Sequence, residues 1–388
     1  MSDLKLFDDL ERTDLEPSQR SESQFAFINR TARPQFIATR EILEKWFSHY
    51  PLEEQQTFRR KFRSDLDQQH TAAFFELCLH ETLLCLSCRV TLHHNVSPNT
   101  SKHPDFLAEP PDEKKIYLEA TVVTGESIQE KGMRNTEKAV YDEIDQRVNS
   151  PNFFIGMNIS GSPKTKPPIR QIVTFLQDRL DALKPDQFDN EPNDGLWDKL
   201  PRWHYFHDGW EIEFFPIPKK PSARGKPNVR PIGLQSYGMR ASVSHEKLKK
   251  AIRKKVSRYG ELKQPYIVAV DVLDHVDRTD IMNALFGDEQ YVYQFTESDF
   301  EPPMMSRSHN GIWISPQGVV NTRLSAVLIA VQLLPWNISS SHLCLYHNPW
   351  AQYPYESVLN FFPQALGKDG RMTWLNGKSI GEVLGVTN

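Results

Sequence analysis

Two apolar stretches of strand type most limit the folds open to this chain. IYLEATVV (116–123) alternates its side chains between two faces, and PYIVAVDV (265–272) is a β-branched run typical of a strand buried on both faces. Amphipathic helical patterns accompany them, as in IRQIVTFLQDRLDAL (169–183). Strands that alternate with helices in this way predict an α/β core decorated by helices.

The remaining patterns assign further segments. Residues 1–30 show no apolar period and predict a loose arm, whereas 34–70 predict helices. TAAFFELCLHETLLCLSC (71–88) is mostly apolar and predicts a buried helix. HEKLKKAIRKKVSRYG (245–260) predicts a helix ended by its final glycine, and we also expect a helix at 322–334.

Composition indicates a soluble globular protein. The chain has 388 residues, enough for two domains or one heavily decorated domain, with 39% hydrophobic and 25% charged residues. The acidic N-terminus lacks the apolar core of a signal peptide, and the apolar run 324–336 is too short to cross a bilayer. Four cysteines do not form a disulfide scaffold, so we expect a cytoplasmic protein without membrane contact.

Basic charge is concentrated in one segment of an acidic protein. Residues 219–263 carry 14 Lys or Arg against Glu246 and Glu261, a net +12, in a chain of net charge −4. Such a segment predicts a face that binds a polyanion, and the alternative is a solvated helix with a basic loop. The candidate nucleic-acid contacts are Lys219, Lys220, Arg224, Lys226, Arg230, Lys250 and Lys254.

Three carboxylates occur in or next to apolar segments. Glu76 and Glu119 lie within such segments, and Asp105 shortly precedes the strand that contains Glu119. Glu119 shares a strand face with Thr121, and Asp105 would join them if the segment before the strand pairs with it. Glu76 is a polar residue of the buried helix. Converging carboxylates repel unless a cation or proton lies between them, and hard oxygen ligands select Mg²⁺, Mn²⁺ or Ca²⁺. In the alternative, Asp105 caps a turn, Glu119 pairs with a buried arginine and Glu76 faces solvent.

A helix glutamate, Pro104-Asp105 and a strand glutamate, in this order, resemble the PD-(D/E)xK nuclease superfamily. The resemblance covers residues 71–123 and implies a restriction-endonuclease-like core, a mixed sheet flanked by helices. It implies that Glu76, Asp105 and Glu119 bind Mg²⁺ or Mn²⁺ and are catalytic.

The chain departs from this family at one position. The family has a lysine two residues after the last acid, whereas this chain has Thr121 there. Lys255 is a candidate replacement, and Lys255 with Tyr259 resembles a polar pair on the second core helix of several such nucleases. Lys131, on the element after the strand, is the nearer alternative. A degenerate site without a catalytic lysine also remains open.

The resemblance implies an N-terminal arm and helices at 1–70, a nuclease-like core at 71–275 and a C-terminal α/β extension at 276–388. Residues 124–244 are then largely an insertion. The expected function is divalent-metal-dependent hydrolysis of DNA, or of RNA. The alternative is an inactive nuclease-like scaffold that binds nucleic acid or a protein. Aromatic residues near the C-terminus form either a homodimer or partner surface or part of the core: Trp313, Trp336, Tyr346, Trp350 and Tyr353.

Overall fold

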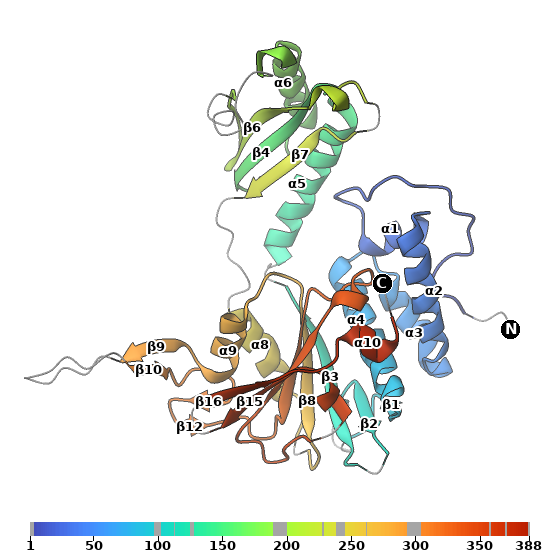
Figure 1. Ribbon diagram of the computed structural model, residues 1–388, viewed down its shortest axis with the longest axis vertical. Coiled ribbons are helices and arrows are strands. Elements are labelled where there is room, and N and C mark those ends of the chain that lie inside the picture. Colours follow the sequence, from blue (N-terminus) through green and yellow to red (C-terminus); the bar gives the residue numbers. More distant parts are fainter. Residues whose placement is uncertain are drawn as a thin grey trace, which may run out of the picture. The chain divides into compact units, whose positions relative to one another are not determined.

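The computed structural model describes residues 4–96, 102–111, 113–124, 128–188, 200–226, 229–237, 245–260, 262–292, 304–356, 358–368 and 371–386 (Figure 1). The chain divides into two compact units. Unit 1 comprises Met1–Glu16, Ser23–Gly125 and Ala241–Asn388, and unit 2 comprises Pro17–Glu22 and Glu126–Arg240. Unit 1 contains the three acids and Lys255.

A mixed sheet flanked by helices forms the centre of unit 1, which confirms the expected α/β class. Eight described strands run in the order β1-β2-β3-β8-β13-β14-β15-β16. The central strands β3, β8 and β13 are parallel, whereas the β1, β2 and β3 neighbours are antiparallel. The strands are β1 (Arg89–Leu92), β2 (Phe106–Glu109), β3 (Ile116–Val123), β8 (Tyr266–Val272), β13 (Ala326–Val331), β14 (Leu343–His347), β15 (Gln364–Lys368) and β16 (Arg371–Leu375).

Each face of this sheet has its own hydrophobic core. Ile267 and Ala269 of β8 belong to one core, and Val268 and Val270 belong to the other, so every residue of this central strand is buried. Burial on both faces explains why the sequence of β8 is continuously apolar. The helices that contribute to the first core include α4 (Asp67–Cys85) and α10 (Ile380–Leu384), and those of the second are α8 (His245–Val256) and α9 (Arg278–Phe286) (Figure 1).

The N-terminal segment is part of the first core, so the expectation of a loose arm over residues 1–30 is wrong. Leu6 and Phe7 are buried, and residues 24–30 form a helix. The apolar residues here are too few to show a period, and only contacts with distant helices reveal their role. The helices are α1 (Gln24–Arg30), α2 (Pro34–Ser48) and α3 (Leu52–Phe62).

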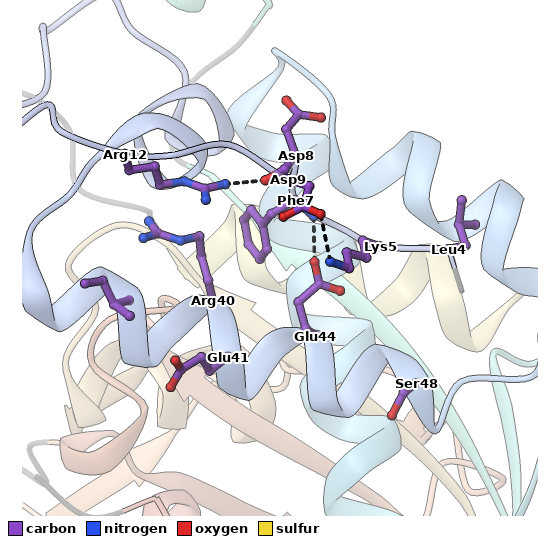
Figure 2. A pocket seen from close by; sticks show the side chains of 11 residues that line it. Leu4, Lys5, Phe7, Asp8, Asp9, Arg12, Arg40, Glu41, Glu44 and Ser48 are labelled. Carbon is purple, nitrogen blue, oxygen red and sulfur yellow. Dashed lines mark hydrogen bonds and ion pairs between the residues drawn. The ribbon is translucent and has the colours of Figure 1, made fainter. Parts of the chain in front are cut away.

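Glu44 of α2 anchors this segment. Its carboxylate accepts hydrogen bonds from the backbone N–H groups of Leu6, at 3.0 Å, and Phe7, at 2.8 Å. Figure 2 shows Glu44 directed at this backbone and the Arg12 side chain lying across from Arg40. A cavity of about 560 Å³ lies between the segment and α2. One carboxylate thus replaces the sheet or helix partners that the bent backbone at Leu6 and Phe7 lacks.

Two helix predictions need correction. Within 322–334 the chain forms β13, parallel to β8, and not a helix. A short apolar run does not distinguish a buried strand from a buried helix by its period. The helix predicted over 245–260 ends at Val256, and the backbone N–H of Arg258 then donates to the carbonyl of Lys255 in a turn. Gly260 therefore does not cap the helix.

Unit 2 is a four-stranded sheet with helices packed against one face. Its strands run in the order β5-β6-β4-β7, with β4 parallel to β7 and antiparallel to β6. Gly156 of β4 lies under the ring of Phe215, where a Cβ atom would come within 2.1 Å of the ring. The elements are α5 (Ile128–Arg147), β4 (Phe153–Gly161), α6 (Ile169–Asp181), β5 (Trp203–His207), β6 (Trp210–Pro218) and β7 (Ile232–Tyr237).

The C-terminal aromatic residues divide between core and surface. Trp313 and Tyr346 are buried in the second core, as expected if these aromatic residues form part of the core. Trp336 and Trp350 are exposed. The Trp336 ring nevertheless contacts Phe36 of α2, with ring centroids 6.1 Å apart.

Among the helices that the structure describes, none combines the length and apolarity required to cross a membrane. Two short hairpins complete unit 1: β9 (Glu289–Val292) with β10 (Met304–Arg307), and β11 (Ile314–Ser315) with β12 (Gly318–Val319).

Asp271 is a buried acid within β8. Its Oδ1 accepts a hydrogen bond from the backbone N–H of Leu333 at 3.2 Å, and its Oδ2 has no hydrogen-bond partner among the described residues. Burial raises the pKa of Asp271 to about 7, against a lowering by the Leu333 N–H. Compared with the unfolded chain, the folded chain therefore favours the protonated, neutral form of the Asp271 carboxyl.

This carboxyl makes stability depend on pH. Its pKa is higher in the folded than in the unfolded chain, so its stabilising contribution is complete below about pH 4 and is lost as pH rises through about 7. We expect Asp271→Asn to raise the free energy of unfolding at about pH 9 by on the order of 2–4 kcal/mol, with a smaller effect at about pH 5. Urea unfolding followed by circular dichroism measures the difference, with exposed Glu11→Gln as the control. A difference that does not change with pH would contradict this assignment.

Candidate active site

The antiparallel pairing of β2 with β3 brings Asp105 beside Glu119. Phe106 is paired with Leu118, so Asp105, one residue before β2, stands opposite Glu119. Asp105 Oδ2 accepts a hydrogen bond from the backbone N–H of Ala120 at 2.7 Å. The sequence predicted that Asp105 would meet Glu119 if the segment before β3 pairs with that strand, and β2 does pair with β3.

Glu119 is fully buried and its carboxylate is contacted by three donors. Lys255 Nζ and Arg258 Nη1 both lie 2.7 Å from the same oxygen, Oε1. The hydroxyl of Tyr259 lies against the other oxygen, Oε2, and 2.6 Å from the carbonyl oxygen of His103, so its single proton is shared between these two acceptors. A buried carboxylate is stable only when such partners replace its lost hydration.

The end of α8 supplies all three of these donors. Leu248, Ile252 and Val256 bury one stripe of α8 in the second core, which fixes the helix on the face of the sheet to which Glu119 points. Lys255 lies in the last helical turn with its side chain 16% exposed, whereas Arg258 follows the helix and is 40% exposed. The structure thus brings Lys255 and Tyr259 together at Glu119, although Tyr259 lies beyond the helix.

Asp105 has a strongly perturbed pKa. Burial raises the pKa of Asp105 to about 7, and the negative charges of Glu119 and Glu76 add to the rise. The positive charge of Lys255 and the N–H of Ala120 oppose it. Near neutral pH this carboxyl therefore exchanges between its neutral and charged forms, which is a property common at functional sites.

Glu76 approaches the site from α4 on the other side of the β2–β3 pair. It is half-buried, and its Oε1 accepts a hydrogen bond from the hydroxyl of Tyr50 at 2.6 Å. Burial, followed by the charge of Glu76, raises the pKa of Tyr50 above its usual range, so the phenol stays a donor. Glu76 interacts with Asp105 through its charge. Tyr50 thereby links the α2–α3 junction to the acids.

The three acids are neighbours but do not form a cation cage in this arrangement. Within the described ranges, no three His, Cys, Asp or Glu side chains are placed so that they could hold a metal ion. Their oxygens match the ligands preferred by Mg²⁺ and Mn²⁺, yet Glu119 is occupied by Lys255 and Arg258, and Glu76 by Tyr50. Metal binding here would require Glu119 to exchange a side-chain partner.

Of the two candidates for the missing lysine, Lys255 has a described side chain and Lys131 does not. Thr121 lies in β3 two residues after Glu119, on the same face of the sheet. Lys131 belongs to α5 in unit 2, and its side chain lies outside the described residues. Lys255 contacts Glu119 directly.

The basic segment does not belong to one unit. Residues up to Arg240 are in unit 2, and the rest are in unit 1. Lys219 is buried, and its Nζ donates to the carbonyl of Ser150 at 2.8 Å, so this lysine is engaged inside unit 2. Arg224 and Arg230 also make hydrogen bonds within unit 2, to Asp186 and Pro17. The candidates with exposed side chains are Lys220 and Lys226 in unit 2 and Lys250 and Lys254 on α8.

Sequence reasoning missed Arg258 and Tyr50. Arg258 is one of 14 cations in the basic segment, and no local pattern separates it from its neighbours. Tyr50 stands at the end of a helical segment before Pro51, a position that suggests only a turn. The alternative to an active site is a Glu119 paired with a buried arginine. The structure shows Glu119 paired with Lys255 and with Arg258, whose side chain is 40% exposed.

The buried pair makes a stability prediction. Lys255→Met should lower the free energy of unfolding by about 2–3 kcal/mol, because it removes one cation from a carboxylate that cannot reach water while Arg258 remains. The adjacent, exposed Lys254→Met should change it by less than about 0.5 kcal/mol. Thermal unfolding of both variants measures the contrast, and equal effects would mean that Lys255 does not neutralise Glu119.

No family model matches this chain, and no curated protein or solved structure matches it either. The likeness to the PD-(D/E)xK superfamily therefore rests on the residues and geometry of unit 1 alone. The nuclease activity that this likeness implies is therefore a proposal.

Proposed function

We propose that unit 1 is a divalent-metal-dependent nuclease of the PD-(D/E)xK type that hydrolyses DNA, with Mg²⁺ or Mn²⁺ as cofactor. The observation that carries the proposal is the contact of Lys255 with buried Glu119, next to Asp105. Cations and carboxylates at this spacing form a site that can hold a phosphate and a metal at once.

The order of elements supports the restriction-endonuclease-like form of the fold. Helix α4, strands β2 and β3, helix α8 and strand β8 follow one another in unit 1, with Glu126–Arg240 of unit 2 inserted between β3 and α8. The two helices contribute to cores on opposite faces of the sheet. This is the sequence of elements that the resemblance implies around the acidic strand pair.

The chain's own residues have separate roles in this proposal. Glu119, Asp105 and Glu76 supply oxygen ligands, and Lys255 places a positive charge where an attacking water and the phosphate would meet. Tyr259 positions Glu119 through its hydroxyl, and Tyr50 positions Glu76. A divalent cation supplies Lewis acidity toward the phosphate and lowers the pKa of water.

The nucleic-acid contacts would come from the exposed cations. Lys250 and Lys254 lie on α8, the same helix that delivers Lys255. Lys220 and Lys226 of unit 2 would contact the backbone elsewhere on the strand. Contacts of this kind are made to phosphates, so binding should weaken as salt rises.

One observation favours the second candidate, an inactive scaffold that binds nucleic acid or a protein. Both oxygens of Glu119 already have partners, and Thr121 stands where the family has lysine. Under this alternative, Lys255 and Arg258 are structural counter-ions and no cation enters the site. Cleavage assays distinguish the two candidates.

We expect the chain to nick plasmid DNA with Mn²⁺ or Mg²⁺ and not with EDTA. Glu119→Gln, Asp105→Asn and Lys255→Met should each lower the rate by at least about a hundredfold, because each removes a charge from the site. Agarose gels measure the rates, and circular dichroism shows that each variant is folded. Cutting that survives Glu119→Gln would refute the site, and salt-sensitive binding without cutting would favour the scaffold.

The pH dependence of metal binding gives a separate test. Asp105 must lose its proton to act as a ligand, and its pKa is raised to about 7, so Mn²⁺ affinity should increase as pH rises through that value. Below about pH 7 the dissociation constant should change by up to about tenfold per pH unit. Calorimetric titration with Mn²⁺ measures it, and Asp105→Asn should abolish the dependence. A flat profile for the wild type would argue against Asp105 as a ligand.

A further inference from the structure

The geometry points to Arg258 as an exchangeable counter-ion, which occupies Glu119 when no metal is bound and moves to a substrate phosphate when metal enters. This inference rests on the proposed function and adds a residue that the family resemblance does not name. It makes Arg258 a positioning residue that couples metal binding to substrate binding.

The first argument is crowding on one oxygen. Lys255 and Arg258 both donate to Oε1 of Glu119 at 2.7 Å, so two positive charges are held against a single carboxylate oxygen. Like charges this close repel, and the attraction of Glu119, with that of nearby Asp105, keeps them there. A divalent cation at the same carboxylate would add two further positive charges. One of the monovalent cations must then leave.

The second argument identifies which cation leaves. Lys255 lies in the last turn of α8 with its side chain 16% exposed, whereas Arg258 follows the helix in a turn and is 40% exposed. Arg258 can therefore reach water with little change in the core, while Lys255 would have to leave a largely buried position. Departure of Arg258 leaves Glu119 with Lys255 and Tyr259 as partners.

The third argument is what Arg258 does after it leaves. A guanidinium matches the oxygens of a phosphate through paired hydrogen bonds. Released from Glu119, Arg258 stays beside the acids because Tyr259, the next residue, is held by His103. A substrate phosphate at the site would thus draw Arg258 off Glu119 and free that carboxylate for the cation. By linkage, metal would strengthen substrate binding by the same factor.

Calorimetric titration of the whole chain with Mn²⁺ alone, in the absence of nucleic acid, tests this exchange directly. Arg258→Gln should bind Mn²⁺ on the order of tenfold more tightly than wild type, because the competing cation is gone. Its KM for a short labelled DNA duplex at saturating Mn²⁺ should rise, because the phosphate contact is lost. Loss of fold would weaken the binding of Mn²⁺ and of DNA together. Tighter Mn²⁺ binding with a higher KM for DNA therefore identifies the exchange.

Matched variants separate failure of this inference from failure of the proposed function. Arg60→Gln removes the same charge at an exposed position of α3, far from Arg258 in the sequence, and should leave Mn²⁺ affinity unchanged. If Mn²⁺ binding requires Glu119 but Arg258→Gln binds equally or more weakly, the exchange is refuted and the metal site stands. If wild type does not bind Mn²⁺, or Glu119→Gln binds it normally, both the metal site and the exchange are refuted.

Discussion

A carboxylate without access to water must be neutralised by its neighbours, and in unit 1 this requirement joins β3 to the end of α8. Glu119 is fully buried, and its partners Lys255, Arg258 and Tyr259 lie within five residues of one another. The buried stripe of α8 fixes the helix on the sheet, so the positions of these partners follow from core packing. Removing any one of them leaves charge or hydrogen-bonding capacity unmet inside the protein.

The same site connects to the N-terminal helices through a neutral donor. Tyr50 is buried against Phe58 and His80, and its hydroxyl holds Glu76 of α4. Burial raises the pKa of Asp105, and the negative charges of Glu119 and Glu76 add to the rise. Two layers on opposite faces of the sheet therefore meet in one electrostatic cluster, which neither layer could form alone.

Local patterns predicted much of the fold and part of the site. The alternation in IYLEATVV correctly separated Glu119 from the residues of this strand that are buried in the first core, and Lys255, the candidate replacement lysine, contacts Glu119. Local patterns failed where structure depends on distant partners. The run that forms β13 has no period of its own, and the N-terminal segment is ordered through Glu44. The role of Arg258 depends on the end of α8, which the sequence placed four residues too late.

The proposed exchange of partners at Glu119 requires that these acids accept a divalent cation. A crystal structure of the chain grown with Mn²⁺, with anomalous diffraction data, would locate that cation. We expect an anomalous peak about 2.0–2.6 Å from oxygens of Asp105 and Glu119, with Arg258 turned away from Oε1. Absence of a peak there at high Mn²⁺, with both cations still on Glu119, would contradict it.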